Sequence, residues 1–124
     1  MKRNNILEEK SFLFAKRIIK LYQYLTKDHK EYVLSKQILR SGTAIGALIR
    51  EFRYAQSKAD FLHKQTIALK EANETEYWLS LLRESEYISA KMYNSLFPDA
   101  KEILKLLIAS TKTLKKGLNS TRNH

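Results

Sequence analysis

The longest uncharged interval of the chain, the nine residues from Ser41 to Ile49, constrains the fold more than any other stretch. Apolar residues recur around it at helical spacing, at Leu34, Ile38, Ile45, Leu48 and Phe52. A second row contains small residues between charged ends: Arg40, Ala44, Ala47 and Glu51. The segment QILRSGTAIGALIRE therefore predicts one helix with two buried faces, at the centre of an all-helical bundle.

Gly42 and Gly46 allow two interpretations of this segment. They stand four residues apart and share one helix surface, where the lack of Cβ atoms would let a neighbouring backbone approach closely. Since each Gly costs about 1 kcal/mol relative to Ala inside a helix, two of them indicate a compensating packing role. The alternative is that they mark a turn that splits the segment. The apolar period continues through both positions and favours one unbroken helix.

Size and composition suit a single domain over residues 1–124. The chain has 44% hydrophobic residues, one Pro and three Gly, which is enough to bury a core without metal or disulfides. The absence of Cys fits a reducing compartment. No apolar run approaches membrane-spanning length, and the N-terminus lacks the apolar region of a signal peptide. We therefore expect a cytoplasmic protein with no membrane partner.

The charge is strongly positive. Lys and Arg number 23 against 13 Asp and Glu, which gives a net charge of +10 and a pI near 9.8. Residues 1–60 hold 13 basic against 6 acidic side chains, and residues 61–124 hold 10 against 7. An excess of this size favours association with polyanions such as nucleic acid.

Apolar periodicity predicts four helices, over about 6–26, 31–56, 58–85 and 98–116. The third should begin after Ser57, because Ser57 and Asp60 match a helix-capping pattern. Pro98 suits the first turn of the fourth helix, after a short helical turn over 87–97, and Gly117 suits its C-terminal cap. The simplest arrangement is an up-down-up-down four-helix bundle. The first three helices have more apolar surface than one core should absorb, which predicts a homo-oligomer.

The second and third helices together resemble a known family. The segments QILRSGTAIGALIRE and SKADFLHKQTIALKEANETEYWL are similar to four helix bundle proteins, also called 23S rRNA intervening-sequence proteins. The matching positions are Gln37, Arg40, Ser41, Ile45, Ala47, Ile49, Glu51, Asp60, Phe61, Ala68, Glu71, Glu74, Thr75, Trp78 and Leu79. Three positions depart from the family pattern, Ala44 for Ser, Leu48 for Asn and Phe52 for Ala, so a polar role of that Asn does not carry over.

The resemblance implies a four-helix protomer that assembles as a ring-like homopentamer with no established enzyme activity. A more distant similarity links the family to accessory proteins of diversity-generating retroelements, which are basic pentameric barrels that bind nucleic acid and a reverse transcriptase. That similarity makes nucleic acid, RNA above all, a plausible partner for this chain.

Two basic stripes are the candidate nucleic-acid-binding residues. The first helix contributes Lys16, Lys20, Tyr24 and Lys27, and the fourth contributes Lys101, Lys105, Lys112 and Lys116. Lysine stripes are more often solvated faces than binding sites, but the net charge and oligomerisation both favour binding here. Tyr24 could stack on an unpaired base or, equally, pack at a subunit boundary.

Charged residues of the second and third helices form a second candidate cluster. Glu71 and Glu74 partly face the interior, so they need cations nearby. A buried structural ion network of Arg40, Arg50, Glu51, Glu71 and Glu74 is favoured over a general acid/base pocket, because no substrate or ligand motif accompanies the carboxylates. Asp60 and His63 form one weak ligand pair without a second copy, so neither a metal site nor a cofactor is predicted.

We therefore expect a protein without enzyme activity, a basic homo-oligomer, with five subunits as the resemblance implies, that contacts RNA phosphates. The alternative is a scaffold whose ring docks a protein partner and has no direct role on nucleic acid. In that case Phe52 and Tyr54 would form an exposed aromatic contact.

Overall fold

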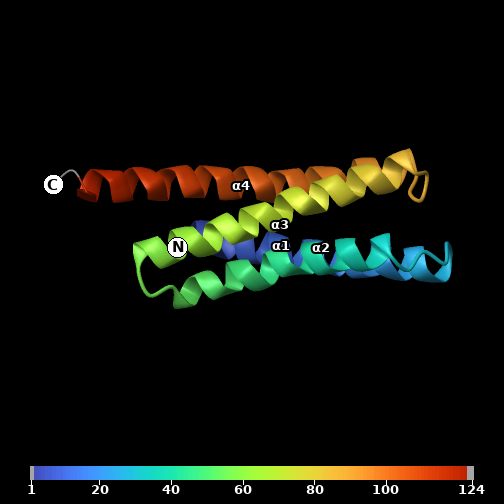
Figure 1. Ribbon diagram of the computed structural model, residues 1–124, viewed down its shortest axis with the longest axis horizontal. Coiled ribbons are helices and arrows are strands. Elements are labelled where there is room, and N and C mark those ends of the chain that lie inside the picture. Colours follow the sequence, from blue (N-terminus) through green and yellow to red (C-terminus); the bar gives the residue numbers. More distant parts are fainter. Residues whose placement is uncertain (1, 123–124) are drawn as a thin grey trace.

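The computed structural model describes the backbone of residues 2–122 and the side chains of residues 6–119, and this part of the chain is all-α without strands. It contains α1 (Lys2–Lys27), α2 (Leu34–Glu51), the short 3-10 helix η1 (Phe52–Tyr54), α3 (Lys58–Glu84) and α4 (Ala90–Arg122). Each helix packs mainly on its neighbour in sequence, and α1 and α4 contact each other less extensively. The α1–α2 and α3–α4 connections lie at one end of the molecule, and the connection from α2 to α3 lies at the other (Figure 1).

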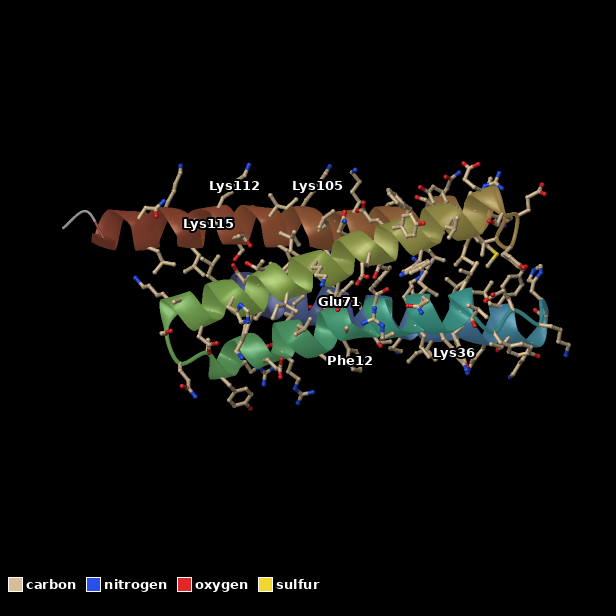
Figure 2. All side chains as sticks on the ribbon, viewed as in Figure 1. Phe12, Lys36, Glu71, Lys105, Lys112 and Lys115 are labelled. Carbon is tan, nitrogen blue, oxygen red and sulfur yellow. The ribbon has the colours of Figure 1, made fainter. Side chains whose placement is uncertain are left out.

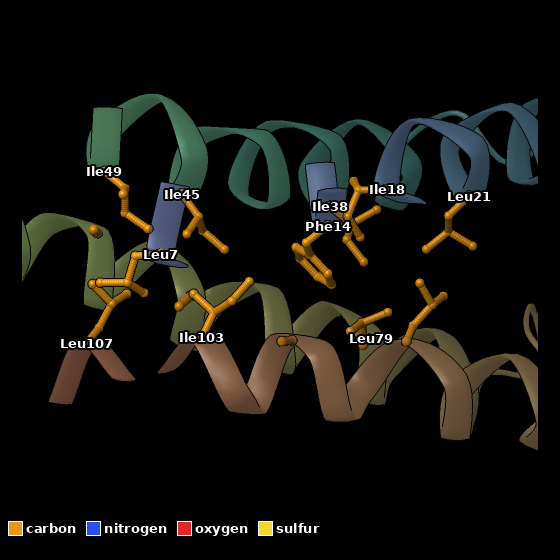
Figure 3. Packing of buried hydrophobic residues seen from close by; sticks show 14 of the residues in the cluster. Leu7, Phe14, Ile18, Leu21, Ile38, Ile45, Ile49, Leu79, Ile103 and Leu107 are labelled. Carbon is orange, nitrogen blue, oxygen red and sulfur yellow. The ribbon is translucent and has the colours of Figure 1, made fainter. Parts of the chain in front are cut away.

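The core lies between the four α-helices, and each of them contributes buried apolar side chains (Figure 3). Ile18 of α1, Ile45 of α2, Leu79 of α3 and Leu107 of α4 have no solvent-exposed surface. These residues sit on the apolar rows that the sequence indicates. The period-3.6 pattern therefore identified the inward faces of the helices.

Gly42 is a point of close approach between α1 and α2. A Cβ atom built on Gly42 would lie 2.9 Å from both Cγ atoms of Ile18, which is closer than real Cβ contacts. One at Gly46 would lie 3.4 Å from the carbonyl oxygen of Ser11. The helix α2 is continuous through both glycines, so the interpretation as a turn is wrong and the packing interpretation is confirmed.

The start of α2 is at Leu34, three residues after the expected position, because Glu31 acts from outside the helix. Its carboxylate accepts hydrogen bonds from the backbone N–H groups of Val33, Leu34 and Ser35, at 3.2, 3.0 and 2.7 Å. Partial burial alone would raise the pKa of Glu31, but the three N–H donors outweigh it and hold the pKa below its usual range. The helix ends at Glu51 rather than near residue 56, because η1 tightens the chain there.

The start of α3 agrees with the sequence. The Ser57 hydroxyl accepts a hydrogen bond from the backbone N–H of Asp60 at 3.0 Å, and the Asp60 carboxylate accepts one from the N–H of Gln56 at 3.0 Å. The first bond satisfies an N–H group that the helix start would leave unpaired, and the second holds the preceding residue Gln56 against the first turn of α3.

The expected start of the last helix at residue 98 is wrong. Helix α4 begins at Ala90, includes the segment expected to be a short separate turn, and carries Pro98 in its interior. Leu96 and Ala100, on either side of Pro98, are buried and hold this part of the helix against the core. The helix also runs through Gly117 to Arg122, so Gly117 is not its C-terminal cap.

Phe52 belongs to the core and not to an exposed aromatic contact. Its side chain is 3% exposed, and its ring lies 5.1 Å from that of Phe61. Tyr54 alone of the expected pair is on the surface, with 74% of its side chain exposed.

Candidate nucleic-acid interface

The outward surface of α4 carries a row of lysines, which we call the α4 lysine face. Its members are Lys101, Lys105, Lys112, Lys115 and Lys116, and all are exposed. The row results from helical periodicity, because Ile103 and Leu107 occupy the opposite, buried side. Lys105 and Lys112 project from the side of α4 that faces away from the other helices (Figure 2).

No neighbouring carboxylate neutralises the α4 lysine face. Asp99 and Glu102, which lie on the same helix, are both directed to α1: Asp99 pairs with Arg17 at 2.7 Å and Glu102 pairs with Lys10 at 3.1 Å. Residues 103–124 contain no Asp or Glu at all. None of the five lysines takes part in an ion pair within the described part of the chain. The face therefore presents uncompensated positive charge to solvent.

The basic stripe of α1 is more mixed. Lys16, Lys20 and Lys27 are exposed, as the sequence indicates. Tyr24 is half-buried against the core, its hydroxyl lies 2.8 Å from Nε2 of His29, and the two rings meet edge to face. The Tyr24 side chain is therefore engaged in contacts within the subunit, whereas the three lysines extend into solvent.

An apolar groove runs between the outer surfaces of α1 and α2. It has a volume of about 660 Å³, and its floor contains small residues such as Gly46 and Ala47. Phe12 and Leu13 line it and are 63% and 52% exposed. Phe12 is labelled on this side of the molecule in Figure 2. Exposed apolar side chains beside a groove are typical of a surface that another protein chain covers.

Glu8 and Arg53 form a bidentate pair at the edge of this groove. The Arg53 Nε donates to Glu8 Oε1 at 2.7 Å, and its Nη2 donates to the other carboxylate oxygen. The hydrogen bond from Arg53 is the main reason why the pKa of Glu8 lies below its usual range. Arg50 lines the same groove and adds to the effect.

The structure brings together three of the five residues expected to form an ion network. Arg40 of α2 lies 3.7 Å from a carboxylate oxygen of Glu71 and 3.7 Å from one of Glu74. Arg50 lies on the groove side of α2, and Glu51 is exposed, so neither joins this cluster. More than half of the Arg40 side chain is exposed, so the network lies at the surface of the bundle and not in its core.

Glu71 is the most buried of the three residues in this cluster. Its side chain is largely buried, and its Oε1 has no hydrogen-bond partner in the described part of the structure. Burial first, and then the neighbouring Glu74 carboxylate, raise the pKa of Glu71 above its usual range, although Arg40 opposes the shift. Figure 2 shows Glu71 near the middle of the bundle.

Two further properties of the described part of the chain concern metal binding and membrane crossing. No group of three or more His, Asp or Glu side chains there could hold a metal ion. None of the described helices combines the length and the apolar character that crossing a membrane requires.

Comparison with known families agrees with the resemblance seen in the sequence. The family model for 23S rRNA-intervening sequence proteins matches residues 3–109. The chain belongs to this family. The match includes nearly all of α1, the whole of α2 and α3, and the first part of α4.

A crystal structure supports the same assignment for this 23S rRNA-intervening sequence protein. It shows a protein of unknown function from the S23 ribosomal protein family of Bacteroides thetaiotaomicron VPI-5482, with 57% sequence identity and a TM-score of 0.87. The similarity covers 89% of this chain and 98% of that one. No match was found among curated proteins.

The structure adds one lysine that sequence reasoning missed. Lys115 lies on the α4 lysine face together with Lys112 and Lys116, and all three follow the end of the family match at residue 109. The lack of acidic residues after Glu102 is the signal that could have revealed the whole basic segment.

Proposed function

We propose that this member of the family is a non-catalytic, basic, RNA-associated protein of the cytoplasm. In this proposal five up-down-up-down bundles form a ring, and the lysines of each subunit contact RNA phosphates without reading bases. The observation that carries the proposal is the α4 lysine face, whose charge no carboxylate of the described structure compensates.

The physical argument concerns phosphate charge. Lysines that neutralise phosphates release bound counterions, and this favourable term is independent of base sequence. Exposed lysines that lack an ion-pair partner can contribute this term without first breaking an ion pair within the protein. The net charge of +10 steers any polyanion toward the protein. The family description, which refers to 23S rRNA, supports RNA as the polyanion.

The apolar groove between α1 and α2 supports self-association. Phe12 and Leu13 expose apolar surface there that the core of a single subunit does not cover. A second copy of the chain would remove this surface from water. The number of five subunits follows the family resemblance, and oligomerisation would multiply the lysine faces accordingly.

The test is a binding measurement with purified, nuclease-treated protein. A structured ribosomal RNA fragment and a matched DNA duplex are each titrated between about 50 mM and about 200 mM salt. We expect binding that weakens steeply as salt rises, and weaker binding of the double variant Lys101→Gln/Lys105→Gln. The matched control is Lys36→Gln/Lys70→Gln, which removes two exposed lysines from α2 and α3. Absence of binding at the lowest salt, or affinity that does not depend on salt, would refute the proposal.

The second candidate, a scaffold that docks a protein partner, has a weaker basis than the sequence suggested. Tyr54 is exposed, but Phe52 is buried and cannot contribute to a contact surface. If the scaffold is correct, Tyr54→Ser should abolish capture of the partner while RNA binding stays unchanged.

A further inference from the structure

The last part of α4, residues 110–122, begins beside α3 and ends beyond the rest of the bundle (Figure 1). Helix α4 is 33 residues long, whereas α1 and α3 have 26 and 27. Figure 1 shows its C-terminal portion continuing beyond the ends of the other three helices. The family match ends at residue 109, just before this segment. We call residues 110–122 the α4 arm.

The α4 arm is fixed to the bundle at its base. The side chain of Gln65 on α3 is fully buried, and its Nε2 donates a hydrogen bond to the Ser110 hydroxyl. The Thr111 hydroxyl lies 3.4 Å from Oε1 of the same Gln65 and donates to it. Leu114 lines a groove of about 490 Å³ together with Phe61. These contacts orient one side of the arm toward α3 and leave the opposite side to solvent.

The charged side chains on the solvent side of the α4 arm are all basic. Lys112, Lys115 and Lys116 are exposed there, and residues 103–124 contain no acidic side chain. Cations near a helix C-terminus stabilise the helix dipole, but this effect falls off within the last turn. Lys112 lies ten residues before Arg122, well outside that turn. Stabilisation of the helix dipole therefore does not explain the presence of Lys112 in this row of lysines.

The composition of the arm indicates which form of nucleic acid it suits. No Phe, Tyr or Trp follows Phe97, so the arm has no ring on which an unpaired base could stack. Its lysines can contact phosphates whatever the base sequence is. A duplex presents about one phosphate charge per 1.7 Å of axis, against about one per 3.4 Å along a single strand. A rigid row of lysines therefore meets more phosphate charge on a duplex.

We infer that the α4 arm is a binding site for the phosphate backbone of double-stranded RNA. This inference rests on the proposed association with RNA. It adds which part of the protein binds the RNA and that the bound RNA is double-stranded. Gln65 is a positioning residue for the site, since it fixes the direction in which the arm leaves the bundle.

The experiment compares two triple variants of the full chain. Lys112→Gln/Lys115→Gln/Lys116→Gln removes the charge of the arm. The matched control is Lys36→Gln/Lys70→Gln/Lys91→Gln, which removes three exposed lysines that lie outside both candidate stripes. The probes are an RNA duplex of about 20 base pairs and one of its strands alone, titrated over a range of salt. Circular dichroism and light scattering verify that both variants keep the helix content and the mass of the wild type.

We expect the wild type to bind the duplex more tightly than the strand. The arm variant should reduce the slope of log affinity against log salt by about 2 to 3, because each phosphate contact contributes about 0.9. The control variant should keep a slope near that of the wild type. An arm variant with the wild-type slope, an equal loss in the control variant, or tighter binding of the strand would each overturn the inference while the proposed function stands. A wild type that binds neither probe at the lowest salt would overturn both.

Discussion

At the scale of single residues, the contact between Gly42 and Ile18 sets the distance between α1 and α2. The Cγ atoms of Ile18 occupy the space that a side chain at position 42 would need. Ile18 is β-branched and fully buried, so it has few alternative rotamers to adopt. A methyl group at position 42 would therefore push the two helices apart.

We expect Gly42→Ala to lower the free energy of unfolding by about 1 to 3 kcal/mol, which is typical of overpacking in a core. Urea denaturation measures the change. Gly117→Ala is the control, because a Cβ there meets no atom within 4 Å and Ala is the better helix former by about 1 kcal/mol. A Gly42→Ala protein as stable as the wild type would contradict the close packing.

Glu71 gives the protein a pH dependence of a definite sign. Burial and Glu74 raise its pKa in the folded state, so the folded protein holds this proton more tightly than the unfolded chain does. The contribution to stability is fully present below the unfolded pKa and is lost as pH rises through the folded pKa. At neutral pH the Glu71 carboxylate therefore opposes folding.

We expect Glu71→Gln to be more stable than the wild type at about pH 7, with the difference shrinking toward about pH 4. Thermal unfolding across this range measures it. The control is Glu51→Gln, which changes an exposed carboxylate that is outside the Arg40 cluster and should leave stability nearly constant. Loss of stability in Glu71→Gln at neutral pH would show that its attraction to Arg40 dominates.

At the scale of helices, α3 is followed by a residue with a strained backbone conformation, Glu86. Glu86 has a φ of 64°, its N–H donates to the carbonyl of Arg83, and the next N–H, of Tyr87, donates to the carbonyl of Leu82. This pair of bonds is the usual termination of a helix by a left-handed residue, a place where Gly is preferred. The side chain of Glu86 therefore costs stability there.

Replacing Glu86 with Gly should raise the free energy of unfolding by about 1 kcal/mol, because Gly adopts positive φ without the clash of a Cβ atom. Chemical denaturation monitored by circular dichroism tests the change. Ser85→Gly is a matched control, since Ser85 has a φ of −88° and gains nothing from Gly. An equal effect of the two substitutions would contradict this account.

The same helix ends explain what the sequence could and could not predict. The start of α3 was predictable because its cap, Ser57 with Asp60, is local in sequence. The end of α4 was not predictable, because Gly117 is of a type that commonly follows a helix C-terminus and yet lies within the helix. Pro98 misled in the same way, since burial of the residues around it outweighs the helix-breaking tendency of Pro. Signals that are local in sequence therefore fail to predict a helix end where tertiary packing determines it.

In the candidate site, too, some features could be predicted from the sequence and others could not. The lysines of α4 were predictable, because a helical stripe depends only on the period of the sequence. The separation of Arg50 from Arg40 could also be anticipated in part, since ten residues of helix span about 15 Å. The contact between Tyr24 and His29 was not predictable, because His29 lies in the connection after α1, whose path the helical period does not determine.

At the scale of the whole molecule, assembly is the property on which the proposed ring depends. Phe12 lies in the groove between α1 and α2 with most of its ring exposed. We expect the wild type to be larger than 14.6 kDa in solution and Phe12→Glu to fall to that mass, because a charge in the groove opposes burial. Light scattering at micromolar concentration measures both.

The control for assembly is Tyr54→Glu, which places the same charge on an exposed aromatic residue outside the groove and should keep the wild-type mass. A wild type of 14.6 kDa would remove self-association from the proposal. A Phe12→Glu protein with unchanged mass would place the subunit contact elsewhere on the surface.

The limited contact between α1 and α4 has a consequence for biosynthesis. Because each helix packs mainly on the one that precedes it, α1, α2 and α3 can associate while α4 is still being translated. Contacts between neighbours in sequence also form quickly, since only short loops have to close. The lysine-rich segment follows α1, α2 and α3 in the chain, so these three helices can pack together before that segment leaves the ribosome.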